Sequence, residues 1–178
     1  MTQAVTHFLV AAILVNLFRD YVVKNKHDFP LHLVLIAGIA GLLPDFDVAA
    51  FWILHYSGLT LAEVHRTFTH NLFVPLLFLV FGIILWGSKN HYLESKHIKL
   101  RNLFFVIAFG VFIHLVLDAT VSGLIMPFYP LSTFAVGLNI INFLPVHFHS
   151  AFLPSLDAVL LMFWMIYLGM KHKISSYI

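Results

Sequence analysis

Long apolar runs separated by short polar connections dominate the chain. Five of these runs cover residues 4–18, 31–43, 71–86, 102–118 and 155–170. Runs of this kind predict helices that enter a membrane, although about 20 apolar residues is the usual length for a complete crossing. Because these runs are shorter, we expect the bilayer to thin around them or some of them to be buried within the protein.

The stretch 119–154 is also apolar, but glycine and proline interrupt it repeatedly. The interrupting residues are Gly123, Pro127, Pro130, Gly137 and Pro145. This pattern predicts a re-entrant or interfacial cap, a lid or a lipid entrance, rather than a sixth span. No internal repeat or separate soluble domain is evident in the sequence. We therefore expect a single integral membrane domain over residues 1–178, an all-α polytopic bundle of about five transmembrane helices.

Composition supports membrane insertion and limits the available chemistry. The 178 residues are 61% hydrophobic and 10% charged, and the mean hydropathy is +0.93. Soluble domains carry about 25% charged residues. The absence of cysteine excludes disulfides and thiolate metal sites, so histidine, aspartate and glutamate are the strong metal ligands that remain.

All basic residues except Arg66 follow the first, third or fifth apolar run. They are Arg19, Lys24, Lys26, Lys89, Lys96, Lys99, Arg101, Lys171 and Lys173. Short loops rich in lysine and arginine stay in the cytoplasm, so five spans would place the N-terminus outside and the C-terminus inside. We expect a multi-pass protein of the inner or plasma membrane in this orientation.

Histidine and aspartate gather at the opposite, outer ends of the runs. This group comprises His7, Asp45, Asp47, His65, His70, His114, Asp118 and Asp157. Ionisable side chains near hydrocarbon are costly and usually mark function. His114 and Asp118 are four residues apart, which places both on one helix face where they can hold one ion. Pro44 disfavours helical geometry at Leu43, so the chain leaves the helix there and can turn Asp45 inward.

The hexapeptide His-Arg-Thr-Phe-Thr-His, which begins at His65, must contain a bend. Its two histidines are five residues apart, which on a regular helix separates them by about 140°. Thr67 and Thr69 are good N-caps for the next helix, which would leave His65 and Arg66 in a loop and His70 in the first turn. Arg66 offers a planar, charged fork to a carboxylate or phosphate.

These positions predict a site for one to three divalent metal ions, with Zn²⁺ as the expected ion. The expected ligands are Asp45, His65, His114 and Asp118, with His7 as a fifth. Arg66 would stabilise charge on a phosphate, while Asp47 or His70 would serve as general base or fix the tautomer of a ligand. The alternative interpretation of this group is a structural polar network.

Three further residues are possible ligands. Asp157 can join the site or simply favour the positive N-terminal end of the fifth helix. His147 and His149 would lie on one side of an extended stretch, or they could be interfacial histidines.

Ordered motifs make the chain resemble the LexA-binding, inner membrane-associated metal-dependent hydrolases, which are small multi-helix membrane proteins. The motifs are Thr6-His7, Leu-Pro-Asp-Phe-Asp from Leu43, the hexapeptide from His65, His-Leu-Val-Leu-Asp from His114, and Gly123 with Pro127-Phe128. At Asn71 the family more often has serine. The resemblance implies a metal-dependent hydrolase and a LexA partner. A site facing outside would be on the wrong side for a cytoplasmic DNA-binding protein, so we discount that partner and leave the protein partner open. We also expect no nucleic-acid partner.

A weaker resemblance, to the zinc-dependent phospholipase C and nuclease group, rests on the order of an early histidine, an aspartate, a further histidine and a His-x-x-x-Asp pair. It implies two or three zinc ions that hydrolyse phosphoesters. The expected function is therefore hydrolysis of a lipid-linked phosphate ester by a metal-activated water at the outer membrane boundary. A metal transporter or sensor, or an intramembrane metalloprotease, is the alternative. Zinc proteases of the His-Glu-x-x-His type and Gly-x-Ser-x-Gly hydrolases are not indicated, because both motifs are missing.

Overall fold

In the computed structural model, the described residues are 4–54, 68–87 and 100–172, together with 56, 58 and 60. The elements in this part of the chain are helices α1 (Ala4–Tyr21), α2 (His32–Ala40), α3 (Phe46–Leu54), α5 (Phe73–Gly87) and α6 (Leu100–Leu117), the π-helical turn η3 (Asp118–Ser122), the 3₁₀ turn η4 (Ile140–Phe143) and helix α7 (Val146–His172). One isolated antiparallel bridge joins Ile125 to Val136. The expected all-α class is confirmed.

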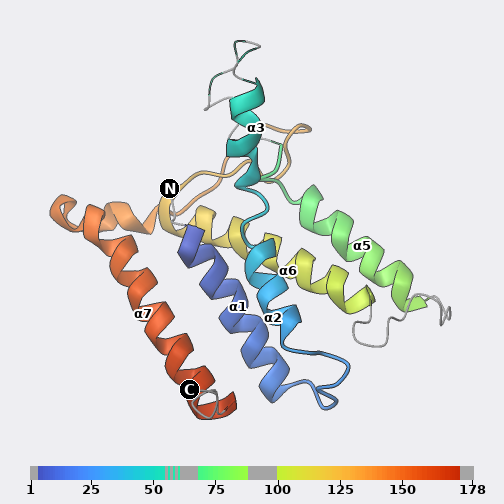
Figure 1. The fold of residues 1–178 in the computed structure, drawn as a ribbon. Coiled ribbons are helices and arrows are strands. Elements are labelled where there is room, and N and C mark those ends of the chain that lie inside the picture. The colour runs from blue at the N-terminus through green and yellow to red at the C-terminus, as the bar shows by residue number, and fades with distance from the viewer. Residues whose placement is uncertain are drawn as a thin grey trace.

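The core of the bundle forms where α1, α2 and α6 pack together (Figure 1). Its buried members are Ala12, Val15, Phe29, Leu33, Val34, Ala37 and Val106. Small residues allow close helix contact here, since a Cβ atom on Gly110 would lie 2.6 Å from the carbonyl oxygen of Ala37. The close approach of α6 to α2 brings one end of each helix to the same end of the bundle.

Three described helices are long and apolar enough to cross a membrane. They cover Ala4–Tyr21, Leu100–Val121 and Val146–Lys171. The apolar part of α5, Phe73–Trp86, is shorter, and α2 has only nine residues. The sequence pattern predicts about five comparable spans, but the second of these, α2, is too short for a complete crossing. It ends at Ala40, where consecutive turns begin, and five of its nine residues are buried inside the protein.

Two elements depart from the sequence pattern. The chain does leave the helix before Pro44, but a new helix, α3, begins directly at Phe46 and projects from the end of the bundle (Figure 1). The last helix begins at Val146 rather than at residue 155, with Pro154 inside it. The predicted start of the last helix is therefore nine residues too late, and residues 146–154 of the expected cap region are helical.

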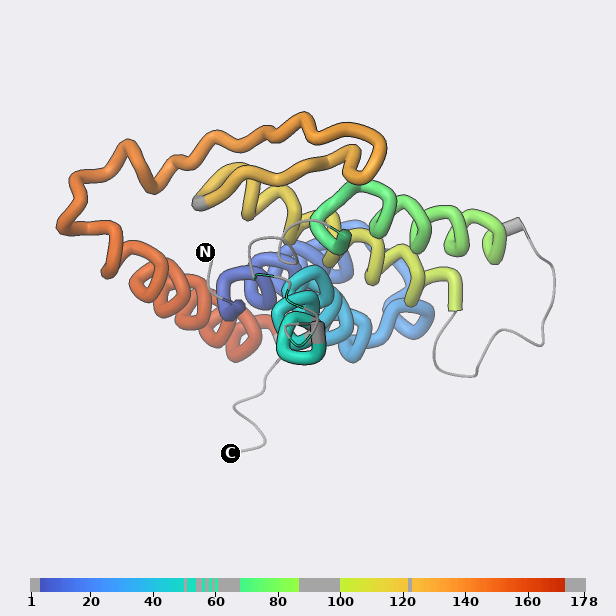
Figure 2. The backbone as a smooth tube through the Cα atoms, turned by 90° about the horizontal axis from the view of Figure 1, so that it is seen from above, coloured from blue at the N-terminus to red at the C-terminus, as the bar shows by residue number. Residues whose placement is uncertain are grey.

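The remaining connection, residues 123–145, leaves η3, runs along one side of the bundle to the beginning of α5, and turns back to reach the beginning of α7 (Figure 2). The backbone N–H of Leu72 donates to the carbonyl of Pro127 at 2.9 Å, and the ring of Phe68 meets that of Tyr129 edge-on. These contacts fix the connection against the segment that precedes α5.

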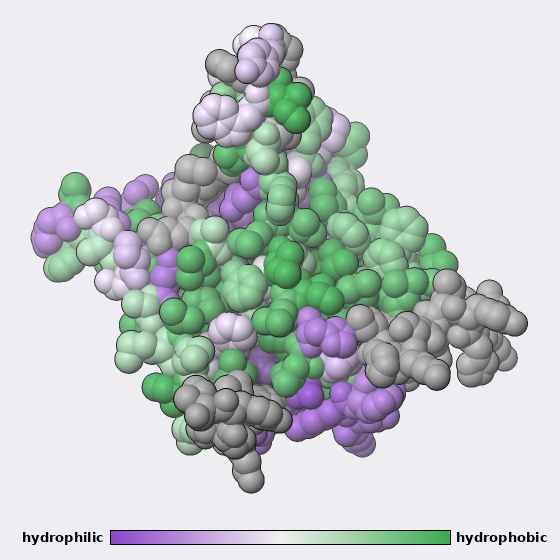
Figure 3. Space-filling model, in the orientation of Figure 1, coloured by the Kyte–Doolittle hydropathy of each residue, from purple (hydrophilic) through white to green (hydrophobic). Residues whose placement is uncertain are grey.

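The surface fits a protein immersed in lipid. Apolar side chains cover the middle of the face in Figure 3, and hydrophilic side chains gather along its lower edge. On α7 the exposed side chains include Met162, Phe163 and Ile166. At the lower ends of α1 and α7, Asp20 pairs with Arg19 and Lys26. Lys171 of α7 lies over the ring of Tyr21 at the end of α1. The described basic residues Arg19 and Lys171 therefore lie at the end of the bundle that is away from the N-terminus.

Candidate metal centre

Five histidine and aspartate side chains from separate elements meet at the N-terminal end of α1. His7 comes from α1, Asp45 from the α2–α3 turn, His70 from the segment before α5, His114 from α6, and Asp118 from the start of the π-helical turn. All except Asp45 are at most 2% exposed, whereas the Asp45 side chain is 28% exposed. The cluster is thus buried on most sides and opens toward Asp45.

The side-chain atoms of the cluster lie at distances suited to a shared metal ion. Nε2 of His70 is 3.1 Å from Nε2 of His114. Asp45 Oδ1 lies 3.6 Å from the first of these atoms and 3.7 Å from the second. Asp118 Oδ2 lies 3.5 and 3.6 Å from the same two atoms. Ligands bound to Zn²⁺ at 2.0–2.2 Å in tetrahedral geometry are separated by roughly 3.3 Å.

Asp118 also faces the fifth member through its other oxygen. Its Oδ1 is 3.4 Å from Nε2 of His7, whose ring stacks on that of His114 with centroids 3.8 Å apart. Two groups of ligand-type atoms result, one of His7, His114 and Asp118, the other of Asp45, His70 and His114. Because π-helical turns often occur at functional sites, the turn that begins at Asp118 is a further mark of this location.

Partners outside the cluster set the tautomers of two histidines. Nδ1 of His114 lies 2.7 Å from the carbonyl oxygen of Gly41. A carbonyl oxygen only accepts hydrogen bonds, so Nδ1 carries the proton, and in the neutral ring Nε2 keeps its lone pair. Nδ1 of His70 lies 3.2 Å from Asp47 Oδ2, which also accepts a hydrogen bond from Thr69 at 2.9 Å. This carboxylate favours the same tautomer in His70.

Two lone pairs that face each other across 3.1 Å repel unless a cation lies between or beside them. A metal ion or a proton can supply that positive charge. The residues present therefore fit a metal ion by both donor chemistry and tautomer.

Electrostatics favours the charged forms of His70 and Asp45 in the metal-free protein. Burial disfavours the charged His70 ring, but contacts with Asp45 and Asp47 outweigh it and raise the pKa of His70 above 6.5. Burial likewise opposes ionisation of Asp45, whereas its contact with His70 and the neighbouring His114 and His7 hold the pKa of this carboxyl below 3.8. In the metal-free protein, this shift favours a proton on His70, and that proton would supply the positive charge that a metal ion otherwise provides.

The structure brings together four of the five ligands expected from sequence, His7, Asp45, His114 and Asp118. His65 and Arg66 lie outside the described residues. The sequence predicts a catalytic or supporting role for His70, whereas the structure places its ring nitrogen among the ligand-type atoms. Asp47 occupies the supporting position, against His70.

The possible additional ligands lie elsewhere. Asp157 on α7 is buried and accepts a hydrogen bond from the hydroxyl of Thr6, next to His7 in the chain. His149 contacts the carbonyl of Leu144 at 2.8 Å, and the ring of His147 lies against Phe148. None of these three belongs to either ligand group.

Asn71 and Gly41 support the site in ways that the sequence analysis did not predict. Asn71, rather than Thr69, caps α5, because its Oδ1 accepts hydrogen bonds from the backbone N–H groups of Phe73 and Val74. His70 consequently precedes the helix. Asn71 was recognisable as a strong N-cap type, but no sequence signal indicates that the Gly41 carbonyl would contact His114.

Comparison with known proteins identifies the family of this chain, but the family description names no activity. No match was found among curated proteins or among solved structures. Over residues 1–175 the chain matches the model of a family described as YdjM inner membrane protein. Because this match covers nearly the whole chain, the protein belongs to the YdjM inner membrane protein family.

Proposed function

We propose that this protein is a membrane-embedded, metal-dependent hydrolase. The observation that carries the proposal is the pair of imidazole Nε2 atoms, 3.1 Å apart, on His70 and His114. Their Nδ1 atoms are occupied by Asp47 and the Gly41 carbonyl, which leaves the Nε2 lone pairs directed at a shared position among two carboxylates. Such an arrangement is typical of metal ligation rather than of a self-contained hydrogen-bond network.

In the proposed enzyme, His7, Asp45, His70, His114 and Asp118 hold one to three divalent ions, with Zn²⁺ the expected metal. A catalytic zinc lowers the pKa of a bound water to about 7 and polarises the substrate oxygen. Asp47 keeps His70 in its ligating tautomer. Substrate approaches from the side of Asp45, since this is the most exposed member of the cluster.

The proposed substrate is a phosphoester on a membrane lipid. Metal ions stabilise the charge that develops in phosphoryl transfer, and the guanidinium of Arg66, four residues before His70, matches the geometry of a phosphate. The five apolar segments enter the membrane with the N-terminus outside and the C-terminus cytoplasmic. Described basic residues at the far end of α1 and α7 support this orientation.

Metal content tests the proposal. Elemental mass spectrometry of detergent-purified wild type is expected to give one to three transition-metal ions per chain. Asp45→Ala and the double variant His114→Ala/Asp118→Ala should lose metal while circular dichroism shows a folded helical protein. His147→Ala, an exposed histidine outside both ligand groups, is the matched control and should keep its metal. Wild type that is metal-free and as stable as the variants would contradict the proposal.

Metal transport is the second candidate, and one observation favours it. The side chain of Asn16 is fully buried in α1, and its polar atoms, like Nε2 of His32, have no hydrogen-bond partner in the described part of the chain. Polar groups below the cluster are what an ion path requires. Metal flux in proteoliposomes that His114→Ala abolishes, without turnover of any phosphoester, would favour transport over hydrolysis.

A further inference from the structure

Helix α3 continues from the metal centre away from the rest of the bundle (Figure 1). Its nine residues are all apolar except Asp47, whose carboxylate is turned toward His70. The side chains of Phe46, Trp52 and Ile53 are 62%, 71% and 77% exposed. In the described part of the chain, α3 makes no extensive contact with another helix. An exposed helix face of this composition calls for an apolar environment that covers it.

The turn between α2 and α3 keeps its backbone hydrogen bonds. The N–H groups of residues 41–43 and 45–48 each donate to a carbonyl three or four residues earlier, at 2.9–3.3 Å. Residue 44 is a proline, which has no N–H group to satisfy. Irregular backbone is tolerated at membrane depth only where its polar groups are satisfied or buried in protein. The turn meets this requirement, so α2 and α3 can follow one another within the bilayer.

The helices on the α2 side of the metal centre are too short to fill a bilayer. About 18 Å of α1 separates His7 from Arg19 at the basic end of the bundle. Asp157 lies level with His7, because it accepts a hydrogen bond from Thr6, and about 21 Å of α7 separates it from Lys171. The hydrocarbon core is ~30 Å thick, so about 10 Å of it remains beyond the metal centre.

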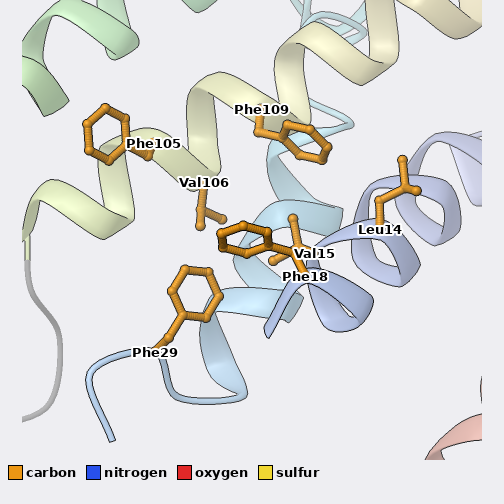
Figure 4. A pocket seen from close by; sticks show the side chains of 7 residues that line it. All are labelled: Leu14, Val15, Phe18, Phe29, Phe105, Val106 and Phe109. Atoms are coloured by element: carbon orange, nitrogen blue, oxygen red, sulfur yellow. The ribbon is translucent and has the colours of Figure 1, made fainter. Parts of the chain in front are cut away.

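The protein around the middle of these helices is apolar. A cavity of about 270 Å³ lies there between α1 and α6, and all the described residues that line it are apolar, among them Leu14, Phe18 and Phe109 (Figure 4). These residues lie between the metal centre and the basic end of the bundle. Hydrocarbon therefore extends to the basic end, and the remaining thickness has to be matched by the part of the protein beyond the metal centre.

We propose that α3 is embedded among the acyl chains of the outer leaflet, where it extends the apolar surface of α2 beyond the metal centre. Its nine residues supply about 13 Å, which covers the ~10 Å of hydrocarbon that remains. Trp52 lies near the end of α3, and Tyr56, which follows the helix, is 92% exposed. Tryptophan and tyrosine gather at the interface between membrane and water, so these two residues mark the outer surface. The metal centre is then recessed below that surface.

Spin labelling can test this placement, because the chain has no cysteine and each introduced cysteine is labelled alone. The nitroxide is attached to Ala49→Cys, an exposed position of α3, in protein reconstituted in phosphatidylcholine vesicles. Its collisions with oxygen, which dissolves in hydrocarbon, are compared with its collisions with chromium oxalate, a charged complex that stays in water. Met162→Cys on the exposed face of α7 is the lipid control, and Lys24→Cys after α1 is the water control. We expect the Ala49→Cys label to lose collisions with chromium oxalate as the Met162→Cys label does.

Two further labels measure depth along α3. Phe46→Cys should show a stronger preference for oxygen than Ile53→Cys, because Phe46 begins the helix beside the metal centre and Ile53 lies near the interface. An equal or inverted order would contradict a helix that runs toward the outer surface. Circular dichroism checks the helix content of every variant, and the three α3 positions allow the comparison even where one variant does not fold.

Two other results would overturn the proposal. Collisions of all three α3 labels like those of Lys24→Cys would place α3 in water. Labels that meet neither reagent, with spectra broadened by a neighbouring nitroxide, would show that a second copy of the chain covers α3. The placement of α3 does not depend on the proposed hydrolysis, because these labels report its surroundings whether or not the protein carries metal.

Discussion

Replacing Asp47 by asparagine removes the carboxylate that holds His70 without removing any expected ligand. Asp47 is 5% exposed, and its Oδ2 lies 3.2 Å from Nδ1 of His70 and accepts a hydrogen bond from Thr69. An asparagine has nearly the same shape, so the fold and the position of the ring should be retained. The charge and the strict acceptor character at this position are lost.

The size of the effect depends on how the new amide is oriented. If its oxygen faces His70, the tautomer persists with a weaker hydrogen bond. If its NH₂ group faces His70, Nδ1 must accept, and the proton moves to Nε2, the atom that faces His114 at 3.1 Å. Loss of a supporting partner of this kind typically costs 10–100-fold in metal affinity, or ~1.4–2.7 kcal/mol. We expect the upper part of this range for the second orientation.

Zinc affinity can be measured by competition with a chromophoric chelator on detergent-purified protein. Asp28→Asn is the matched control, because it removes the same charge beside the beginning of α6, where Asn102 donates a hydrogen bond to the backbone carbonyl of Asp28. Circular dichroism should show equal helix content in all three proteins. An affinity of Asp47→Asn equal to that of the wild type would refute the argument that this carboxylate sets the tautomer of His70.

Two further predictions concern pH and helix capping. Zinc affinity should fall as pH decreases through the raised pKa of His70, above 6.5, with release of a proton on binding, which calorimetry in buffers of different ionisation enthalpy detects. In the metal-free protein this raised pKa contributes stability that is complete below 6.5 and is lost as pH rises through the folded-state pKa, so thermal unfolding with and without zinc should show opposite pH trends. Asn71→Ala should destabilise the protein by about 0.5–2 kcal/mol, because it removes the N-cap of α5, whereas Asn71→Ser should retain most of the stability; equal melting temperatures of the two variants would contradict this role.

The parts of the site that depend on local spacing could be predicted from sequence. His114 and Asp118 are one turn apart, and the distance of 3.6 Å between Nε2 of His114 and Oδ2 of Asp118 is compatible with that spacing. Asp45 could be placed because Pro44 ends the helical geometry before it. Neither inference needs information from distant parts of the chain.

Positions that depend on helix boundaries were harder to predict. The role of His70 depends on whether α5 begins after Thr69 or after Asn71, and Thr69 instead donates its hydroxyl hydrogen to Asp47, 22 positions earlier. The sequence pattern places Pro154 before the last helix, but α7 continues through it. α3 follows Pro44 directly, in a stretch for which the sequence pattern predicted no helix.

Helix packing and the geometry of the site meet at Gly41. A Cβ atom at this position would lie 2.8 Å from the carbonyl oxygen of His7, and the Gly41 carbonyl receives the Nδ1 proton of His114. The residue therefore lies in contact with both α1 and α6 at the level of the ligands. A side chain there would force α1 away and shift the His7 ring from its stacking contact with His114. The same close packing that builds the core therefore sets the distances between the proposed metal ligands.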